Sequence, residues 1–255
     1  MIYGLYLSAQ GAEAQAFRQA VLANNLANAQ TTAFKPDVPL FRAHFPFDVV
    51  QQTTAIVPDT LEQQTGGVDL AATVTDHSQG PLTVTHGALD VAVVGPGFLQ
   101  AHDGQETLLT RNGRLALNHL RQLVTADAGH PLLNTDGVPL AIPVEASDVE
   151  IGPDGTVLGT TADGARVLVG RLALVEPAES AGLMKRGASY YAVQGEIVPA
   201  AQAELRQGVL EDSLVHPVSA MVELIETART FEMNMSMLRL QDEMAGQLLR
   251  TMPRR

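Results

Sequence analysis

Apolar side chains recur at alternating spacings of three and four residues at both ends of the chain. In the first segment the recurring positions are Tyr3, Leu7, Gln10, Ala14, Phe17, Val21, Asn24 and Asn28. This alternation is the a/d pattern of a helix packed along another helix. A second stripe of Leu5, Ala9, Ala12, Ala16, Ala20, Ala23 and Ala27 flanks the first. The apolar surface is wider than one partner would cover, so the pattern predicts more than one neighbour.

The last segment carries a longer version of the same pattern. From Pro217 onward the recurring positions are Met221, Leu224, Ala228, Phe231, Met235, Leu238, Asp242, Ala245 and Leu249. Proline suits the first turn of a helix, so we expect a helix that begins at Pro217. Continued to Arg250, it would be about 50 Å long at 1.5 Å per residue. That length, without an internal stop, favours a coiled-coil-like assembly over an ordinary core helix.

The middle of the chain changes to short strand-sized apolar runs. Residues 36–80 are rich in proline and threonine and predict a connector with sparse regular structure. From residue 81 to about 208, Asn112-Gly113 and four Asp-Gly pairs separate the runs, and such pairs favour the tight turns of antiparallel hairpins. The pattern predicts an α+β fold whose N- and C-terminal helices pair, with an irregular antiparallel β-rich middle. The predicted zones are 1–35, 36–80, 81–208 and 209–255.

Composition and charge narrow the function classes. The chain is 45% hydrophobic, has a net charge of −12 and contains no cysteine. A basic face is needed to bind nucleic acid, so we expect no nucleic-acid partner. No apolar stretch reaches the roughly 20 residues that span a bilayer, so we expect a chain that is not embedded in a membrane. Residues 1–17 carry no basic side chain, so a cleavable signal peptide is not expected.

A search for catalytic motifs finds no nucleophile elbow, phosphate loop or dinucleotide fingerprint. The histidines form no helical pair suited to zinc. We therefore predict no catalytic, cofactor or metal site and no small-molecule substrate. Two other classes stay open at this point. One is a β-domain enzyme with helical extensions, and the other is a surface-binding module tethered by a coiled coil.

Three amides stand out at Asn24, Asn25 and Asn28, because asparagine is a poor helix former. They could cap free carbonyls where the helix ends and a turn begins. Alternatively, Asn24 and Asn28 continue the apolar seam, where an amide fixes the register against a partner helix. The residue pattern does not separate these two interpretations.

Three segments of the sequence resemble one family, the axial proteins of the bacterial flagellum, which include rod, hook and hook-associated subunits. The most specific segment is residues 23–35, Ala-Asn-Asn-Leu-Ala-Asn-Ala-Gln-Thr-Thr-Ala-Phe-Lys. A second lies at residues 207–217 and runs into the last helix, and a third includes residues 109–113 and 122–127. Ala33 stands where the family usually has glycine, and Gln30 where asparagine is common. We therefore expect the turn after the first helix to be built differently. His216 stands where the family usually has asparagine before the last helix, which bears on how that helix is capped.

The resemblance implies a structural rod subunit, closer to the proximal-rod than to the distal-rod members. It implies other rod and hook subunits and the flagellar type III export apparatus as partners, with assembly in the periplasm. A hook-type or distal-rod subunit is the alternative. We expect terminal segments that gain order on assembly, through heterologous contacts that build an open array. The predicted subunit interface comprises Leu7, Phe17, Val21, Asn24, Asn25, Leu26, Asn28, Met221, Leu224, Ile225, Phe231, Met235 and Leu238.

Overall fold

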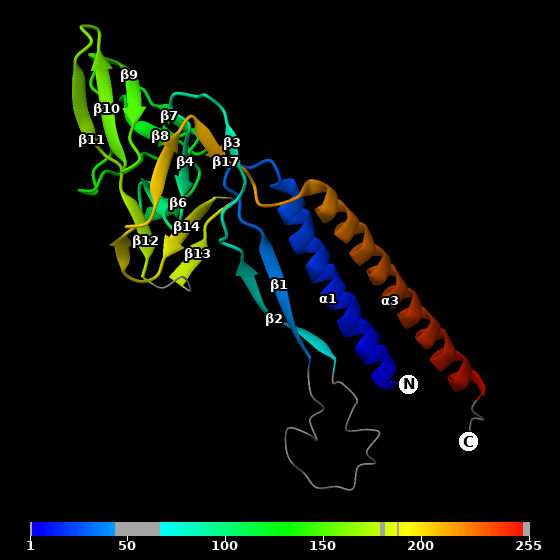
Figure 1. The fold of residues 1–255 in the computed structure, drawn as a ribbon. Helices are drawn as coiled ribbons and strands as arrows, with labels where there is room; N and C mark the ends of the chain where they lie inside the picture. The colour runs from blue at the N-terminus through cyan, green and yellow to red at the C-terminus, as the bar shows by residue number, and fades with distance from the viewer. Residues whose placement is uncertain (1, 44–66, 179–181, 188, 252–255) are drawn as a thin grey trace. The chain divides into compact units, whose positions relative to one another are not determined.

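A computed structural model describes residues 2–43, 67–178, 182–187 and 189–251 of the chain. The chain divides into two compact units (Figure 1). The first unit contains Met1–Ala27, Pro36–Asp76 and His216–Arg255, and the second contains Asn28–Lys35 and His77–Val215. The helical ends and the β-rich middle of the predicted fold are confirmed.

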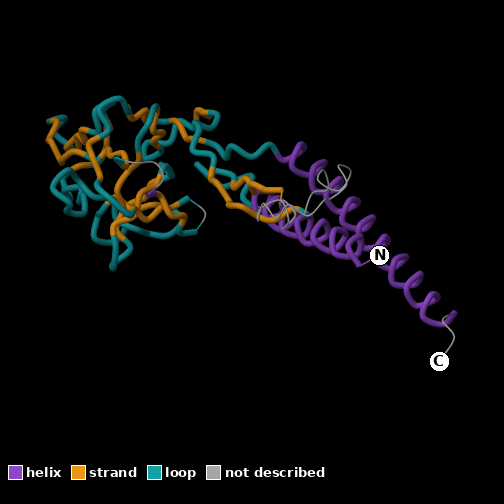
Figure 2. The backbone as a smooth tube through the Cα atoms, turned by 90° about the horizontal axis from the view of Figure 1, so that it is seen from below, coloured by secondary structure: helices purple, strands orange, loops and turns teal. Residues whose placement is uncertain are grey.

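The first unit contains two long helices and a two-stranded ribbon. The helices are α1 (Ile2–Ala27) and α3 (Pro217–Thr251), which begins at the predicted proline. The strands are β1 (Asp37–Ala43) and β2 (Val68–Thr75), which pair antiparallel. Helix α1 packs against α3 and also against both strands, as Figures 1 and 2 show. Neither helix, over its described residues, combines the length and apolar character needed to cross a membrane.

Two glycines bring α1 and α3 close together in an antiparallel arrangement. A Cβ added at Gly4 would lie 3.4 Å from the Gln241 side chain, and one at Gly11 would lie 3.3 Å from the Asn234 side chain. The two glycines are one heptad apart, and so are the two amides that they face. The absence of a Cβ on α1 leaves room for these amide side chains between the helices.

The less exposed face of α3 largely follows the predicted three/four alternation. It includes Ala220, Leu224, Thr227, Ala228, Phe231, Asn234, Met235, Leu238, Gln241 and Ala245. Leu224, Ala228, Phe231, Met235, Leu238 and Ala245 were predicted to lie there, whereas the predicted Met221 is 47% exposed and the predicted Asp242 is also exposed. The glycines of α1 explain part of the difference, because they accommodate polar side chains at 234 and 241. Tyr3 and Leu249 were also predicted seam positions, and their side chains are not among those that the structure describes.

The second unit holds short antiparallel strands, and every strand pairing among its described residues is antiparallel. Its largest sheet has the order β13-β14-β6-β5-β12-β15, and a separate sheet has the order β11-β10-β9. The strands are β3 (Leu82–Val84), β4 (Val91–Val94), β5 (Phe98–His102), β6 (Thr107–Thr110), β7 (Leu115–Leu117), β8 (Leu123–Thr125), β9 (Ala146–Ile151), β10 (Thr156–Thr161), β11 (Arg166–Arg171), β12 (Leu174–Pro177), β13 (Leu183–Lys185), β14 (Tyr190–Val193), β15 (Ile197–Pro199), β16 (Glu204–Gln207) and β17 (Val209–Glu211). Its main core includes Val91, Leu99, Leu123, Leu132 and Val157, all buried.

The predicted turn glycines fall into two groups. The glycines of the four Asp-Gly pairs all have the positive φ that was expected of a tight turn. Gly113 does not have a positive φ, so the hairpin-turn prediction for Asn112-Gly113 is wrong. A Cβ at Gly113 would lie 1.5 Å from the Val91 carbonyl oxygen, and the Val91 amide donates to the Gly113 carbonyl at 2.9 Å. Glycine is needed there because two backbone segments come into close contact.

Residues 36–80, the predicted connector, contain the β1–β2 ribbon, while residues 44–66 lie outside the described residues. The division of the chain into four zones stays a prediction. The two compact units have other boundaries, because residues 28–35 group with the β-rich unit and the β1–β2 ribbon groups with the helices.

Candidate assembly interface

The N-terminal motif ends in a turn, residues 28–35, that is anchored within the β-rich unit. The Thr31 amide donates to the Asn28 carbonyl at 3.1 Å, and the Ala33 amide donates to the Glu211 carbonyl at 2.8 Å. Ala33 has a φ of 57°, the left-handed conformation that costs an L-residue about 1–2 kcal/mol. The backbone at this position therefore takes a glycine-type conformation although the residue is alanine. That the turn differs from the turn of the family stays a prediction.

Further hydrogen bonds hold the same turn. Ser189 donates through its hydroxyl to the Thr32 carbonyl at 3.0 Å. Lys185 donates through Nζ to the Lys35 carbonyl at 2.8 Å and lies 4.2 Å from the centroid of the Phe34 ring. Phe34 is 1% exposed. The motif therefore ends in a segment that the β-rich unit fixes on several sides.

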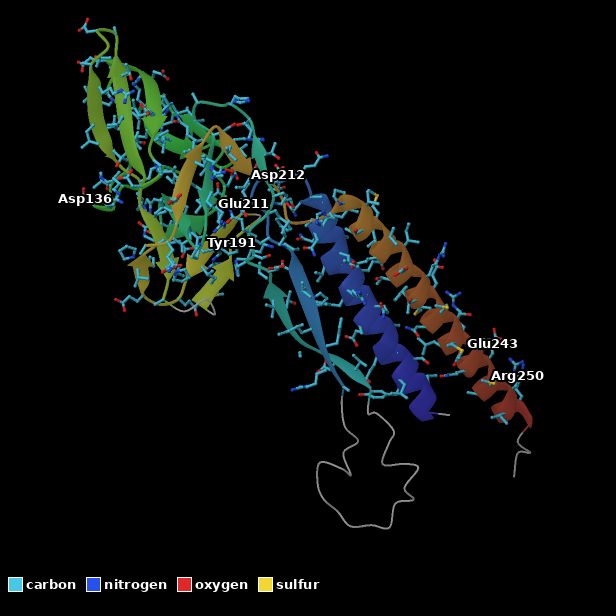
Figure 3. All side chains as sticks on the ribbon, in the orientation of Figure 1. Asp136, Tyr191, Glu211, Asp212, Glu243 and Arg250 are labelled. Atoms are coloured by element: carbon cyan, nitrogen blue, oxygen red, sulfur yellow. The ribbon has the colours of Figure 1, made fainter. Side chains whose placement is uncertain are left out.

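A buried ion cluster links three distant parts of the sequence within the β-rich unit. The Glu211 carboxylate, at the end of β17 and labelled in Figure 3, accepts from Lys35 Nζ and from Arg111 Nε, the latter at 2.8 Å. It also accepts from the Gly80 amide at 2.7 Å. The Lys35 and Glu211 side chains are fully buried, and that of Arg111 is 4% exposed.

Two cations share the Glu211 carboxylate, and backbone carbonyls also accept hydrogen bonds from both of them. Arg111 donates to the carbonyls of Val93, Gly95 and Gly97 at 2.7–3.0 Å, and Lys35 donates to that of Ser78. Buried charges are tolerated only when hydrogen bonds replace the lost hydration. The three charged residues lie in the three segments that carry the family resemblance, although the predicted interface included none of them.

Asn25 acts within the helical unit. Its side chain donates to the Asp37 carbonyl at 2.8 Å and accepts from the Asp37 amide at 3.0 Å, so both amide atoms bind the first residue of β1. Asn25 is 6% exposed, whereas its neighbour Asn24 is exposed. Asn28 belongs to the following turn, where its side-chain oxygen accepts from the Thr31 hydroxyl. Asn25 and Asn28 thus serve the turn and the ribbon, which agrees with the helix-end interpretation of these amides.

The predicted interface residues lie on both faces of the helices. Leu7, Phe17, Val21, Leu26, Asn28, Leu224, Phe231, Met235 and Leu238 are half-buried, Asn25 is buried, and Asn24, Met221 and Ile225 are exposed. The structure therefore places most of them on the less exposed faces. Their contact with other subunits stays a prediction.

Helix α3 also exposes large apolar side chains. Val218, Met221, Val222, Ile225, Met233, Met237, Leu240, Met244 and Leu248 are 45–73% exposed. On α1 the second stripe is also exposed at Leu5, Ala9, Ala16, Ala20, Ala23 and Ala27, and only Ala12 in it is buried. Large apolar side chains exposed outside the less exposed face of a helix are typical of a helix with further neighbours.

The titratable groups indicate structural roles. Burial, followed by the hydrogen bond that Tyr190 donates to Asp127, raises the pKa of the Tyr190 phenol above its ordinary value. Hydrogen bonds from backbone amides hold the pKa of Asp103 below its ordinary value, and the Thr156 hydroxyl and amide do so for Asp154. Both aspartates lie in exposed Asp-Gly turns. Across the described ranges, no group of three or more His, Asp or Glu side chains is placed to hold a metal ion.

These features define a structural protein, with long helices that present apolar surface and a β-rich unit fixed by buried charges. Three family models match the chain. They are the flagella basal body rod protein model at residues 5–35, the flagellar hook protein FlgE/F/G D1 domain at 92–159, and the flagellar basal body rod FlgEFG protein C-terminal model at 206–251. Lys35, Arg111 and Glu211 each fall in a different matched segment.

Similar curated proteins cover nearly the whole chain. The flagellar basal-body rod protein FlgF of Salmonella typhimurium is 35% identical over 96% of this chain and 96% of its own length. FlgF of Escherichia coli is 34% identical with the same coverage, and FlgG of Bacillus subtilis is 30% identical over 98% of both chains. The chain belongs to the flagellar basal-body rod protein family. It is a structural rod subunit of the flagellum and not an enzyme.

Proposed function

We propose that this rod subunit polymerises through the outward faces of its two terminal helices, after these have paired in a coiled-coil-like manner. The observation that carries the proposal is the exposed apolar surface of α3, with Val218 at 73%, Met233 at 61% and Ile225 at 54% exposure. Covering apolar surface contributes about 25 cal/mol per Å², so a helix of this kind gains stability when neighbours cover it. The exposed alanine stripe of α1 supports a second neighbour.

The coiled-coil-like pairing is supported by the spacing of less exposed residues on α3. One series of them, from Ala220 to Ala245, alternates by four and three residues, which is the period of a heptad seam. The facing pairs Gly4 with Gln241 and Gly11 with Asn234 are one heptad apart on both helices. Because the exposed faces would complete their burial only in the array, we infer that the order of the helices and assembly are coupled.

Family membership supports the wider setting of this function. We infer that the subunit is exported through the flagellar type III apparatus without a cleaved signal peptide. It would then assemble in the periplasm with other rod and hook subunits. Overall length, residues 89–93 and the methionine-rich residues 231–237 favour a proximal-rod subunit of the FlgF type. Rescue of a strain that lacks FlgF, but not of one that lacks FlgG, would support this assignment.

Two exposed positions on α3 provide the test of polymerisation. Ile225→Asp and Met237→Asp place a charge on the outer face, and we expect each to remove the chain from purified basal bodies and to abolish swimming in soft agar. Leu168→Asp is the matched control, because Leu168 is 66% exposed on β11 in the other unit. Thermal unfolding of the purified variants should match that of the wild type. Normal incorporation of both α3 variants would contradict the proposal.

Leu224→Asp and Leu238→Asp address a different step. Both leucines lie on the less exposed face of α3, so these variants should weaken the pairing of the helices as well as assembly. A loss of helical signal in the purified monomer, seen only for these two variants, would separate pairing within a subunit from contacts between subunits.

A further inference from the structure

The β1–β2 ribbon presents an outward face that no described part of the helical unit covers. Cross-strand pairing places Val38 beside Val74 and Leu40 beside Ala72 on this face. Val38, Leu40 and Val74 are 46–49% exposed, and Ala72 is also exposed. A two-stranded ribbon is marginally stable on its own, so an apolar outer face on it indicates a further contact.

A charged pair follows the two apolar pairs on the same face. Arg42 pairs across the strands with Asp69, and both side chains are exposed. Along β1, side chains on one face are about 7 Å apart, because each residue rises about 3.3 Å and side chains alternate. On β2 a register shift between the pairings of Leu40 and Phe41 places Asp69 three residues from Ala72. The β1 side of the face therefore presents apolar, apolar and charged side chains at intervals of about 7 Å.

The first half of α3 carries the same order of side chains along one exposed line. Val218, Val222 and Ile225 lead into Arg229 and Glu232, with heptad-like spacings of four and three residues. All five side chains are exposed. This line lies on the part of α3 away from the less exposed face, since it shares none of the positions of that face.

The two patterns also agree in length. From Ile225 to Arg229 the helix rises about 6 Å, close to the spacing of about 7 Å between Leu40 and Arg42 on the strand. With Leu40 placed on Ile225, the charged pair of the ribbon reaches the level of Arg229. The pair of Val38 and Val74 lies about 7 Å from Leu40 toward the start of β1. In this alignment it reaches α3 at a level between Val218 and Val222.

The charges at the end of this alignment are of opposite sign. Arg229 would lie beside Asp69, and Glu232, one helical turn further on, would lie beside Arg42. Complementary charges fix register and exclude wrong partners more than they add affinity. The apolar pairs would supply the buried area, and the charges would set the alignment.

We propose that the outward face of the β1–β2 ribbon of one copy docks on the Val218-to-Glu232 line of α3 of a second copy, with β1 and α3 running in the same direction. The proposal deepens the assembly role proposed above and depends on it. Both surfaces belong to the helical unit of every subunit, and they differ from each other. The contact is therefore heterologous, and its repetition gives an open array of copies where the rotation between copies does not close into a ring.

The chain contains no cysteine, so an introduced pair reports a single contact. The test is Leu40→Cys combined with Ile225→Cys, with mild oxidation of intact basal bodies followed by non-reducing electrophoresis. We expect a ladder of covalent multimers of this chain. Co-expression of the two single variants should give only a dimer that contains one of each. Leu40→Cys combined with Met237→Cys is the control and should give none, because residue 237 lies on another side of α3.

The outcomes separate the docking from the assembly role. A dimer of the Leu40→Cys variant with itself, or a cross-link only to a different rod protein, would overturn docking on a second copy. So would the absence of a cross-link while the variants are present in basal bodies. Absence of the wild-type chain from basal bodies would instead refute the assembly role, and the proposal with it.

A charge reversal covers the case in which the cysteine variants are not incorporated. Asp69→Arg and Arg229→Asp should each lower incorporation at least tenfold. The double variant should restore it to within about threefold of the wild type, because each copy then presents reversed charges to the next. Failure of the double variant to recover, with both single variants folded as judged by circular dichroism, would overturn the proposed register.

Discussion

Replacing Glu211 with glutamine would remove the carboxylate that joins the buried ion cluster. Gln is nearly isosteric, so the change leaves the packing and takes away the negative charge that Lys35 and Arg111 share. Both cations would remain buried without this carboxylate. Breaking a buried ion pair by removing one member costs about 3–5 kcal/mol. Since a domain is stable by about 5–15 kcal/mol, much of the stability of the β-rich unit would be lost.

For a unit of roughly 150 residues, 1 kcal/mol shifts the melting temperature by about 2–4 °C, so Glu211→Gln should lower it by roughly 6–20 °C. Urea unfolding followed by circular dichroism measures the loss of free energy directly. Glu150→Gln is the control, because Glu150 forms an exposed ion pair with Arg166 at 3.3 Å and should cost under about 1 kcal/mol. Equal losses for the two variants would refute the reasoning. Lys35→Met should cost less than Glu211→Gln, since Arg111 and Glu211 then remain paired.

Three further changes test the helical unit and the tyrosine. Gly11→Leu should lower the stability of the helix pair by about 1–3 kcal/mol, because a side chain added at this position meets the Asn234 side chain of α3 at 3.3 Å. The measurement is far-ultraviolet circular dichroism on heating, in which the helical signal should be lost at a lower temperature. Asn25→Ala removes two hydrogen bonds to the ribbon and should cost about 1–3 kcal/mol in thermal unfolding, while Asn24→Ala, at an exposed position, should cost less. The pKa of Tyr190 is raised in the folded state, so the unfolding free energy should hold its full value below about pH 10 and fall as the pH rises above it. Tyr190→Phe should flatten this fall in urea unfolding measured across the pH range, and an unchanged fall would contradict the reasoning.

The helices could be predicted from sequence because their signals are local. The proline at position 217 sets the start of α3, and the three/four alternation gives its period. The side of α3 that faces α1 was harder to predict, because large apolar residues also lie outside that side. Thr227 and Asn234 lie on the less exposed face, whereas Met221 is exposed, and hydrophobicity alone would rank these positions the other way. The deciding feature, a glycine on the opposite helix, belongs to the pair and not to α3.

The ion cluster could not be predicted from spacing. Lys35 and Glu211 are 176 positions apart, and Arg111 and Glu211 are 100 positions apart. No periodicity connects residues at such separations, and each looks like an ordinary surface charge in its own segment. A partial signal was present at Glu211, because it ends the buried strand that begins with Val209 and Leu210. A charge at a buried strand position requires a partner.

The turn of residues 28–35 limits how the polypeptide can be shortened. It follows α1 directly, yet it belongs with His77–Val215, and the ribbon is inserted between the two. A truncation that removes α1 together with this turn would delete Lys35 and leave Arg111 and Glu211 without the third member of their cluster. The N-terminal cut that spares the β-rich unit therefore falls before Asn28, and fragments designed for biophysical work should begin there.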